Sequence, residues 1–340
     1  MTTQQLSVQP DGSVAALGSA PGRNTNRWLS FLVRRLTRAI VALFVIVTAA
    51  FAVLRLAGGD PVRAALGPTA DEAVVQARRD QLGLNDPPLE QYWNYLAGLL
   101  HGDLGISLIT GRSVTELVEF RLPATLQLAV IAFLLVLLIA VPIGLVIAIL
   151  TQNGRRRGTE LTFTTVTGFF AAIPEYLLAV FLILVFSVTL RMLPVAGMSG
   201  GETFILPVLA LALGSSASLA RIARVEALNV LSEDFIRTAR SKRLPGWMIN
   251  FKHALPNMLT ATLTLGGSLL ATMIVGSVLV EQVFNWPGLG SAFVQAIVTK
   301  DYGIVQGLAI VYATVILLVN LLVDIVLSLI DRRTTLLETA

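Results

Sequence analysis

Residues 122–150 read LPATLQLAVIAFLLVLLIAVPIGLVIAIL, and no charged side chain interrupts them. A hydrocarbon core about 30 Å thick requires roughly 20 consecutive apolar residues in a helix, so this stretch is long enough to cross a bilayer. Predominantly apolar intervals occur again on both sides of it, at about 31–56, 161–190, 203–220, 255–280 and 304–330. The sequence therefore predicts an all-α integral membrane protein with six transmembrane helices.

The third of these spans differs from the others because Pro174 and Glu175 lie near its middle. Proline removes a backbone donor and kinks a helix, and an acidic side chain facing lipid is costly. We expect a kink at these two residues.

Composition supports the membrane assignment. Of 340 residues, 55% are hydrophobic and 14% are charged, and the mean hydropathy is +0.76. Soluble domains are roughly a quarter charged, so these values argue against a cytosolic enzyme. The chain has no cysteine, which excludes disulfide scaffolds, thiolate metal sites and cysteine nucleophiles.

Lysine and arginine residues predict the orientation. If the N-terminus is cytoplasmic, 17 of the 25 fall in the inner segments, and seven of these lie in the segment 221–257. By the positive-inside rule both termini should be cytoplasmic. A cleaved export signal at Arg34-Arg35 is the alternative, but five further spans follow it.

The predicted organisation has five parts, each set by composition and turn signals. They are a disordered cytoplasmic tail at 1–27, a first transmembrane helix at 28–56, an acid-rich extracytoplasmic subdomain at 57–121, a transmembrane core at 122–331 with an inner loop at 227–257, and a cytoplasmic tail at 332–340.

Several kinds of chemistry are missing from the sequence. None of the three lysines, Lys242, Lys252 and Lys300, follows a glycine-rich turn, so no phosphate-binding loop is possible. Two distant histidines exclude a His-Glu-x-x-His zinc site, and we predict no metal site and no catalytic residue. An intramembrane serine protease using His253 and a serine of the 215–218 run is the alternative from another functional class.

The inner segment reads EDFIRTARSKR at 233–243, LPGW at 244–247 and MINFKHALP at 248–256. Acidic residues begin it and basic residues end its first half, as the helix dipole favours. This pattern predicts helix, turn and helix, with Phe251, Leu255 and Met258 beginning an apolar face that leads into the fifth span. Composition alone also favours a basic amphipathic segment that rests on anionic headgroups.

This segment resembles the cytoplasmic EAA loop of ABC-importer permeases, in the form found in dipeptide and oligopeptide permeases. DFIRTARSK at 234–242 matches the usual start of the loop, and FKHALPN at 251–257 matches the usual end. Outside the loop, RLPATL at 121–126 and EQVFNWPGLG at 281–290 resemble the first of the two peptide-permease subunits. Arg243 replaces a usual glycine, which shifts the expected break to Gly246.

The resemblance implies a type I importer fold and a coupling helix that docks into a groove of an ATPase subunit. The residues implied in this contact are Asp234, Arg237, Ala239, Arg240, Arg243, Leu244, Pro245, Gly246, His253, Leu255 and Pro256.

The resemblance also implies the partners and the location. The chain would be a multi-pass subunit of a bacterial inner membrane, and it would form a pathway for di- and oligopeptides with a second homologous permease. Two ATPase subunits, or one fused ATPase, would use ATP and Mg, and an extracytoplasmic binding protein or lipoprotein would deliver cargo. This chain would bind no cofactor and no nucleic acid. Import of a nickel complex, glutathione or haem by the same family is the alternative.

Polar residues in the spans are candidates for contact with cargo, because buried polar groups in membranes are functional suspects. They are Glu175, Glu281, Gln282, Asn320 and Asp324. Each also has a structural interpretation, which for Glu281 is capping of the turn at Trp286. Candidates for contact with the binding protein are Asp103, Trp286, Asp301 and Tyr302.

Overall fold

The computed structural model describes residues 24–56, 60–67 and 69–330. The tail predicted at 332–340 lies outside these ranges, and so does the tail predicted at 1–27 except for its last residues, which begin the first helix. The chain divides into two compact units, Met1–Ala42 and Leu43–Ala340. The first helix passes from one unit into the next, and every other element belongs to the second unit.

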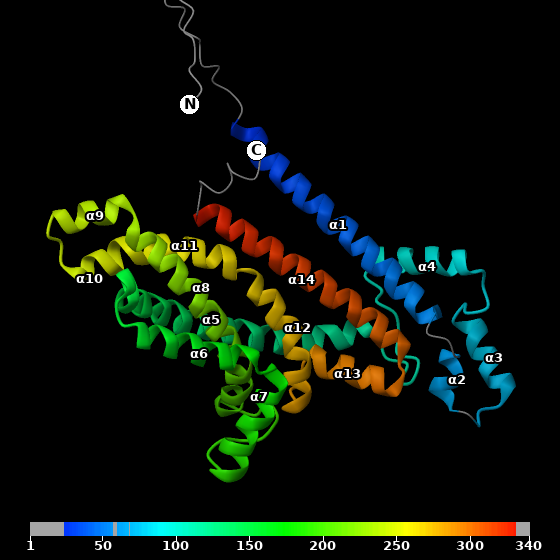
Figure 1. Cartoon of the computed structure of the whole chain (residues 1–340). Helices are drawn as coiled ribbons and strands as arrows, with labels where there is room; N and C mark the ends of the chain where they lie inside the picture. Colours follow the sequence, from blue (N-terminus) through cyan, green and yellow to red (C-terminus); the bar gives the residue numbers. More distant parts are fainter. Residues whose placement is uncertain (1–23, 57–59, 68, 331–340) are drawn as a thin grey trace, which may run out of the picture. The chain divides into compact units, whose positions relative to one another are not determined.

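The described residues form helices and no β-strand, with one isolated bridge between Ile106 and Ser113 (Figure 1). The helices are α1 (Asn24–Leu56), α2 (Pro61–Leu66), α3 (Glu72–Gln81), α4 (Pro88–Leu100), α5 (Val114–Thr151), α6 (Arg157–Ala172), α7 (Glu175–Leu182), α8 (Ile205–Ser232), α9 (Asp234–Ser241), α10 (Gly246–Met248), α11 (Leu255–Gly266), α12 (Ser268–Val283), α13 (Leu289–Thr299) and α14 (Tyr302–Ile330). Two π-helical segments, Ile183–Thr189 and Ile249–Ala254, continue α7 and α10.

Four stretches are long and apolar enough to cross a membrane, and two bent helix pairs raise the number to as many as six. The four are Val33–Ala52, Val114–Gly154, Gly201–Ser232 and Tyr302–Leu327. Up to six spans are thus available, in agreement with the prediction from sequence.

The first bent pair contains the predicted kink. Arg157–Ala172 and Glu175–Thr189 meet at 94°. Ile173 has an extended backbone there, which is the conformation that a following proline imposes. The kink expected at Pro174 and Glu175 is confirmed.

The second bent pair was not expected. The sequence predicts one span over 255–280, but helices Gly246–Gly266 and Ser268–Val283 meet at 45°. The break falls at Gly266-Gly267, and a glycine pair is one of the recognised causes of a helix kink. The fourth span also differs, because α8 continues to Ser232 and does not end near Ala220.

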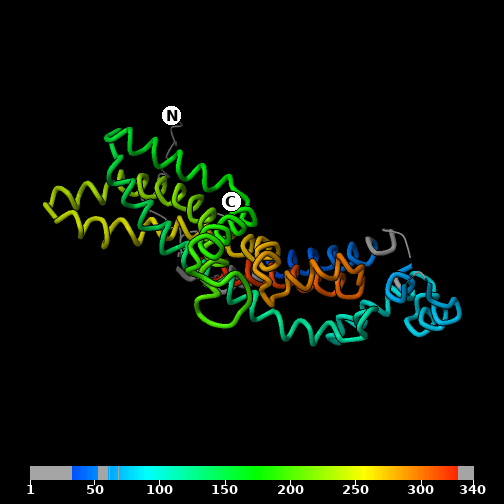
Figure 2. Tube along the Cα trace, turned by 90° about the horizontal axis from the view of Figure 1, so that it is seen from below, coloured from blue at the N-terminus to red at the C-terminus, as the bar shows by residue number. Residues whose placement is uncertain are grey.

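Hydrophobic packing in the second unit is organised in three clusters. The largest lies between α5, α7, α8 and α12 and includes Leu128, Leu211 and Met273. A second cluster surrounds α9, and a third joins α5 to α12, α13 and α14. Within this unit, α9 and α10 lie at one end and α2 and α3 lie at the other (Figures 1 and 2).

Candidate functional site

The inner segment forms the predicted helix, turn and helix. Glu233 has an extended backbone between α8 and α9, and α9 ends at Ser241. A short connection then leads to α10, which continues through the π-helical segment into α11. The helix start at Glu233-Asp234 is confirmed, with Arg240 in the last turn of α9.

A buried cluster fixes α9 to the spans. Ile236 is fully buried and Ala239 is 6% exposed, and both belong to one hydrophobic cluster with Leu145 of α5 and Ala223 of α8. Beside the cluster, Nη2 of Arg240 donates to Oε1 of Gln152 at 3.0 Å, just after the end of α5. The cluster and this hydrogen bond therefore connect α9 to α8 and to the end of α5.

The inner segment carries three exposed aromatic side chains. Phe235 is 42% exposed, Trp247 is 64% exposed and Phe251 is 61% exposed. The same segment carries five exposed basic residues, namely Arg237, Arg240, Lys242, Arg243 and Lys252. Aromatic residues and arginine are enriched in protein–protein interfaces. We call Phe235, Trp247 and Phe251 the aromatic triad.

Sequence reasoning missed the aromatic triad as a functional feature. Phe251 was expected on an apolar face with Leu255 and Met258, and this was wrong. Met258 is fully buried, whereas Phe251 points outward, because the π-helical segment at Ile249–Ala254 has more residues per turn and shifts the face. The presence of aromatic residues within a strongly basic loop could have predicted this surface from the sequence.

The residues predicted to couple to an ATPase fall into three groups. Seven are exposed: Asp234, Arg237, Arg240, Arg243, Pro245, Gly246 and Pro256. Leu244, His253 and Leu255 are half-buried, and Ala239 is buried. Ala239 therefore supports α9 from within the permease and is not placed to contact a partner.

The turn after α9 corrects a second expectation. Arg243 adopts a left-handed φ of 54°, and the N–H groups of Arg243 and Leu244 donate to the carbonyls of Arg240 and Ala239 at 2.9 and 3.3 Å. This is a Schellman motif, in which glycine is the usual residue at the left-handed position. The break therefore stays at Arg243 and does not move to Gly246, which begins α10.

Glu281, near the end of α12, lies inside the protein. Its side chain is fully buried, and Oε2 accepts hydrogen bonds from the N–H groups of Gly290 at 2.7 Å and Ser291 at 3.2 Å. Ser277 donates to Oε1 at 3.2 Å. Because Gly290 and Ser291 open α13, the Glu281 carboxylate caps that helix, and this geometry supports the structural interpretation over contact with cargo.

Trp286 also lies in the interior, in the same turn. It is fully buried, its Nε1 donates to the carbonyl of Ala124 at 3.1 Å, and its ring meets that of Phe204 edge-on at 4.6 Å. The expectation that Trp286 contacts a binding protein is therefore wrong for this structure. Its large apolar surface is used to anchor the turn to α5.

Asp301 is likewise buried, with 2% exposed. Its carboxylate accepts hydrogen bonds from Oγ of Ser107 at 2.5 Å and from the N–H of Leu108 at 3.1 Å. Asp301 thus joins the loop before α5 to the start of α14. The expectation that it contacts the binding protein at the surface is wrong for this structure. Asp103 remains exposed, and Tyr302 is half-buried.

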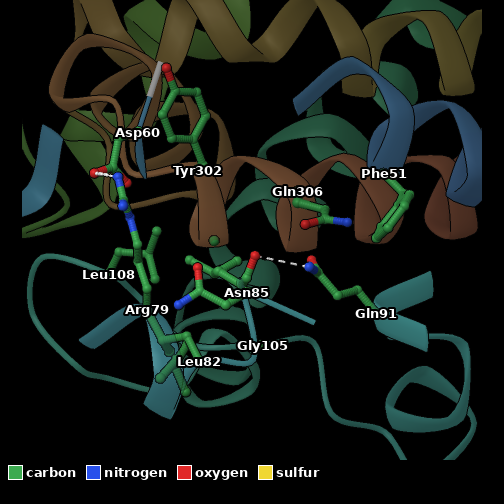
Figure 3. A pocket seen from close by; sticks show the side chains of 13 residues that line it. Phe51, Asp60, Arg79, Leu82, Asn85, Gln91, Gly105, Leu108, Tyr302 and Gln306 are labelled. Carbon is green, nitrogen blue, oxygen red and sulfur yellow. Dashed lines mark hydrogen bonds and ion pairs between the residues drawn. The ribbon is translucent and has the colours of Figure 1, made fainter. Parts of the chain in front are cut away.

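Tyr302 lines a pocket of about 770 Å³ (Figure 3). The lining residues come from the end of α1, the region α2–α4, the loop before α5 and the start of α14, and they include Phe51, Asn85, Gln91 and Gln306. The carboxamide side chains of Asn85, Gln91 and Gln306 offer uncharged hydrogen-bond donors and acceptors. Nε2 of Gln91 donates to the carbonyl of Leu84 at 3.0 Å, which fixes its orientation.

An ion pair forms one wall of this pocket. Nη2 of Arg79 donates to Oδ2 of Asp60 at 2.5 Å (Figure 3). Burial alone would raise the pKa of Asp60, but hydrogen bonds from Arg79 and from the N–H of Val62 outweigh it and lower that pKa below its ordinary value. The pair is neutral overall, so the wall has no net charge near neutral pH.

The remaining pathway candidates come from α7, α12 and α14. Glu175 is half-buried at the first position of α7, and its carboxylate lies against Gly276 of α12, about 3.2 Å from where a Cβ would be. Asn320 and Asp324 are half-buried on α14, and Gln282 is exposed.

Comparison with known proteins decides the family. The family described as "Binding-protein-dependent transport system inner membrane component" matches residues 140–336, and its N-terminal counterpart matches residues 28–129. The chain belongs to this family. It is an ABC-importer inner-membrane permease, and the resemblance stated from its motifs is confirmed.

Relatives of this permease include the glutathione transport system permease protein GsiC. The proteins from Shigella flexneri serotype 5b and Escherichia coli K12 are each 33% identical to it over 303 residues, which is 89% of this chain and 98% of theirs. A chain from the inward-facing MetNI methionine ABC transporter is similar in fold, with a TM-score of 0.54 and 18% identity, covering 64% of this permease and 97% of that chain.

The family assignment fixes the general role. The permease is a multi-pass subunit of the inner membrane and is not itself the ATPase. It works with a second permease, ATPase subunits and a substrate-binding protein.

A serine–histidine pair is not formed among the residues that the structure describes. The buried hydroxyl of Ser216 has no hydrogen-bond partner there, whereas His253 lies in the inner segment. The same residues contain no group of three His, Cys, Asp or Glu side chains that could hold a metal ion.

Proposed function

We propose that this permease imports short peptides, with glutathione among its cargo. The observation that carries the proposal is the 33% identity to permeases named for glutathione transport, which extends over nearly their whole length. Glutathione is a tripeptide, so it falls within the peptide class that the motifs indicate. Nickel complexes and haem are the competing cargoes.

The ATPase subunits dock on the aromatic triad and the basic residues around it. Exposed aromatic side chains next to a buried cluster support this docking surface, because aromatic residues are enriched in protein interfaces. ATP and Mg bind in the ATPases. Their closure pushes α9 and α10, and the buried cluster passes this movement to α5 and α8.

Both termini are cytoplasmic in this proposal, and α2, α3 and α4 lie outside. The distribution of lysine and arginine supports this orientation. Because the chain has no cysteine, single cysteines at exposed Lys242 and Asp86 report the topology directly. An impermeant maleimide added to intact cells should label Asp86→Cys and leave Lys242→Cys unmodified until the membrane is opened, and the reverse pattern would overturn the orientation.

The binding protein meets the outer surface near Asp103 and Tyr302. Both remain accessible, Asp103 in the loop before α5 and Tyr302 at the pocket. Substitution of Asp103 by Arg should weaken delivery of cargo without changing ATPase co-purification.

A transport assay tests the proposed cargo. The importer is assembled from this permease, its second permease and the ATPases in proteoliposomes, and ATP-dependent uptake of labelled glutathione, a dipeptide and an oligopeptide is measured with the matched binding protein. Uptake of at least one peptide is expected, and omission of the binding protein is the control. Uptake of only a nickel complex or haem would reject the proposal.

A further inference from the structure

Helix α4 carries an apolar stripe that is exposed along its length. Leu89 is 67% exposed, Trp93 is 61% exposed and Leu100 is 88% exposed. Their separations of four and seven residues place them on one face of a helix. A soluble surface would rarely present three large apolar side chains in one row.

The other faces of α4 have different surroundings. The rings of Tyr92 and Tyr95 lie 5.1 and 5.7 Å from the ring of Phe51 on α1, measured between centroids. Glu90 and Asn94 are exposed on a polar face. The helix therefore has a face packed on α1, a polar face, and the apolar stripe between them.

A hydrogen bond sets the depth of α4. The hydroxyls of Tyr92 and Thr48 are 2.7 Å apart. Thr48 belongs to the apolar stretch Val33–Ala52 and lies four residues before its end, which is about 6 Å along a helix. Tyr92 is therefore held level with the last turn of a membrane span.

We propose that α4 is an interfacial helix whose apolar stripe lies in the lipid leaflet next to residue 52. Amphipathic helices insert their apolar face about 5–10 Å into the boundary between headgroups and acyl chains, which matches the depth set by Thr48. Tryptophan is enriched at this boundary. The span on α1 also exposes large apolar side chains, including Phe44 and Val45.

This placement has a consequence for the pocket. Gln91 belongs to α4 and lines the pocket, so an α4 held by lipid keeps that wall at a constant height above the bilayer. The depth of α4 in the bilayer does not depend on the cargo. The orientation proposed above only adds that the leaflet is the outer one.

Spin labels test the proposal in the assembled importer, reconstituted in nanodiscs of phosphatidylcholine and phosphatidylglycerol. Single cysteines replace Leu89, Leu100 and, as the matched control on the polar face, Asn94. Collisions with oxygen, which concentrates in lipid, are compared with collisions with Ni(II)-EDDA, which stays in water. Labels at 89 and 100 should favour oxygen several-fold more than the label at 94.

Two results would overturn the proposal. Equal access to Ni(II)-EDDA at 100 and 94 would place the stripe in water, and low access to both relaxants at 89 and 100 would show that a protein subunit covers it. Trp93 gives an independent measurement without cysteines. Lipids brominated near the headgroup should quench the wild-type fluorescence more than that of the Trp93→Phe variant, and equal quenching would contradict insertion.

Discussion

The carboxylate of Glu281 on α12 accepts a hydrogen bond of 2.7 Å from the N–H of Gly290, and both residues are buried. The first N–H groups of a helix have no partner within it and need one when they are buried. Here the partner comes from the preceding span, so the cap also joins α12 to α13. Arg121 strengthens the same turn by donating to Oγ of Ser291 at 3.2 Å.

Removal of this cap should destabilise the permease. Glu281→Ala leaves the N–H groups of Gly290 and Ser291 without an acceptor, which should cost about 2–4 kcal/mol. Glu281→Gln retains one oxygen acceptor and should cost less. Thermal unfolding in detergent measures both. A stable Glu281→Gln variant that has lost transport would instead indicate a role in the pathway.

The close approach of α13 to α12 predicts a second effect. A Cβ at Gly290 would lie 2.5 Å from Cα of Val278, which is backbone and cannot move aside. Gly290→Ala should therefore lower stability by more than about 2 kcal/mol. Gly158→Ala is the matched control, because nothing lies within 4 Å of its Cβ position and alanine favours helix. Equal unfolding temperatures for the two variants would contradict the packing.

The sequence predicted the spans, the kink at Pro174 and the helix–turn–helix of the inner segment. These features depend on local properties, namely hydropathy, proline and charge order. The interior positions of Trp286 and Asp301 could not be predicted, because they depend on Ala124 and Ser107, which are far away in the chain. The residues next to a tryptophan in the sequence do not show whether its side chain is buried or exposed.

The aromatic triad should contribute to binding of the ATPase and little to folding. Trp247→Ala and Phe251→Ala should each change stability by no more than about 0.5 kcal/mol, since both side chains are exposed. If they are central to the interface, each should weaken association by about 2 kcal/mol, or roughly 30-fold. Co-purification and titration with the ATPase measure the loss.

A buried residue of the same segment provides the control. Ile236→Ala should lower stability by about 2–4 kcal/mol, because Ile236 is fully buried on the inner face of α9. Ala239→Glu should behave similarly by placing a charge in that cluster. Normal ATPase binding by both Trp247→Ala and Phe251→Ala would show that the docking surface lies elsewhere.

The left-handed residue after α9 predicts a stabilising substitution. A non-glycine residue pays about 1 kcal/mol for this conformation, so Arg243→Gly should stabilise the inner segment by up to that amount. Arg240→Gly removes the same charge inside α9 and should destabilise it by about 1 kcal/mol. Hydrogen exchange of the α9 amides should be slower than in the wild type for Arg243→Gly and faster for Arg240→Gly. Faster exchange in Arg243→Gly would contradict the Schellman geometry.

The ion pair between Asp60 and Arg79 predicts a pH dependence in the outer subdomain. The pKa of Asp60 is lowered in the folded protein, so the stability that it contributes is complete above the unfolded value of about 3.9 and is lost as the pH falls through the folded pKa. Asp60→Asn keeps an N-cap for α2 but removes the charge. Hydrogen exchange in α2 and α3, corrected for intrinsic rates, should be faster in this variant at pH 7, and the difference should shrink below about pH 4.

Arg78 gives the matched control for this measurement, because it lies beside Arg79 on α3 and its Nη1 donates only to Gln81 among the contacts described, at 3.1 Å. Arg78→Gln removes one unit of charge, of opposite sign to that of Asp60, outside the ion pair, and should leave the exchange of α2 unchanged at every pH. A difference between wild type and Asp60→Asn that stays constant from pH 7 to pH 3 would show that the carboxylate charge does not hold α2 against α3. The wall of the pocket would then depend on apolar packing around Val62 and Val75, which are both buried.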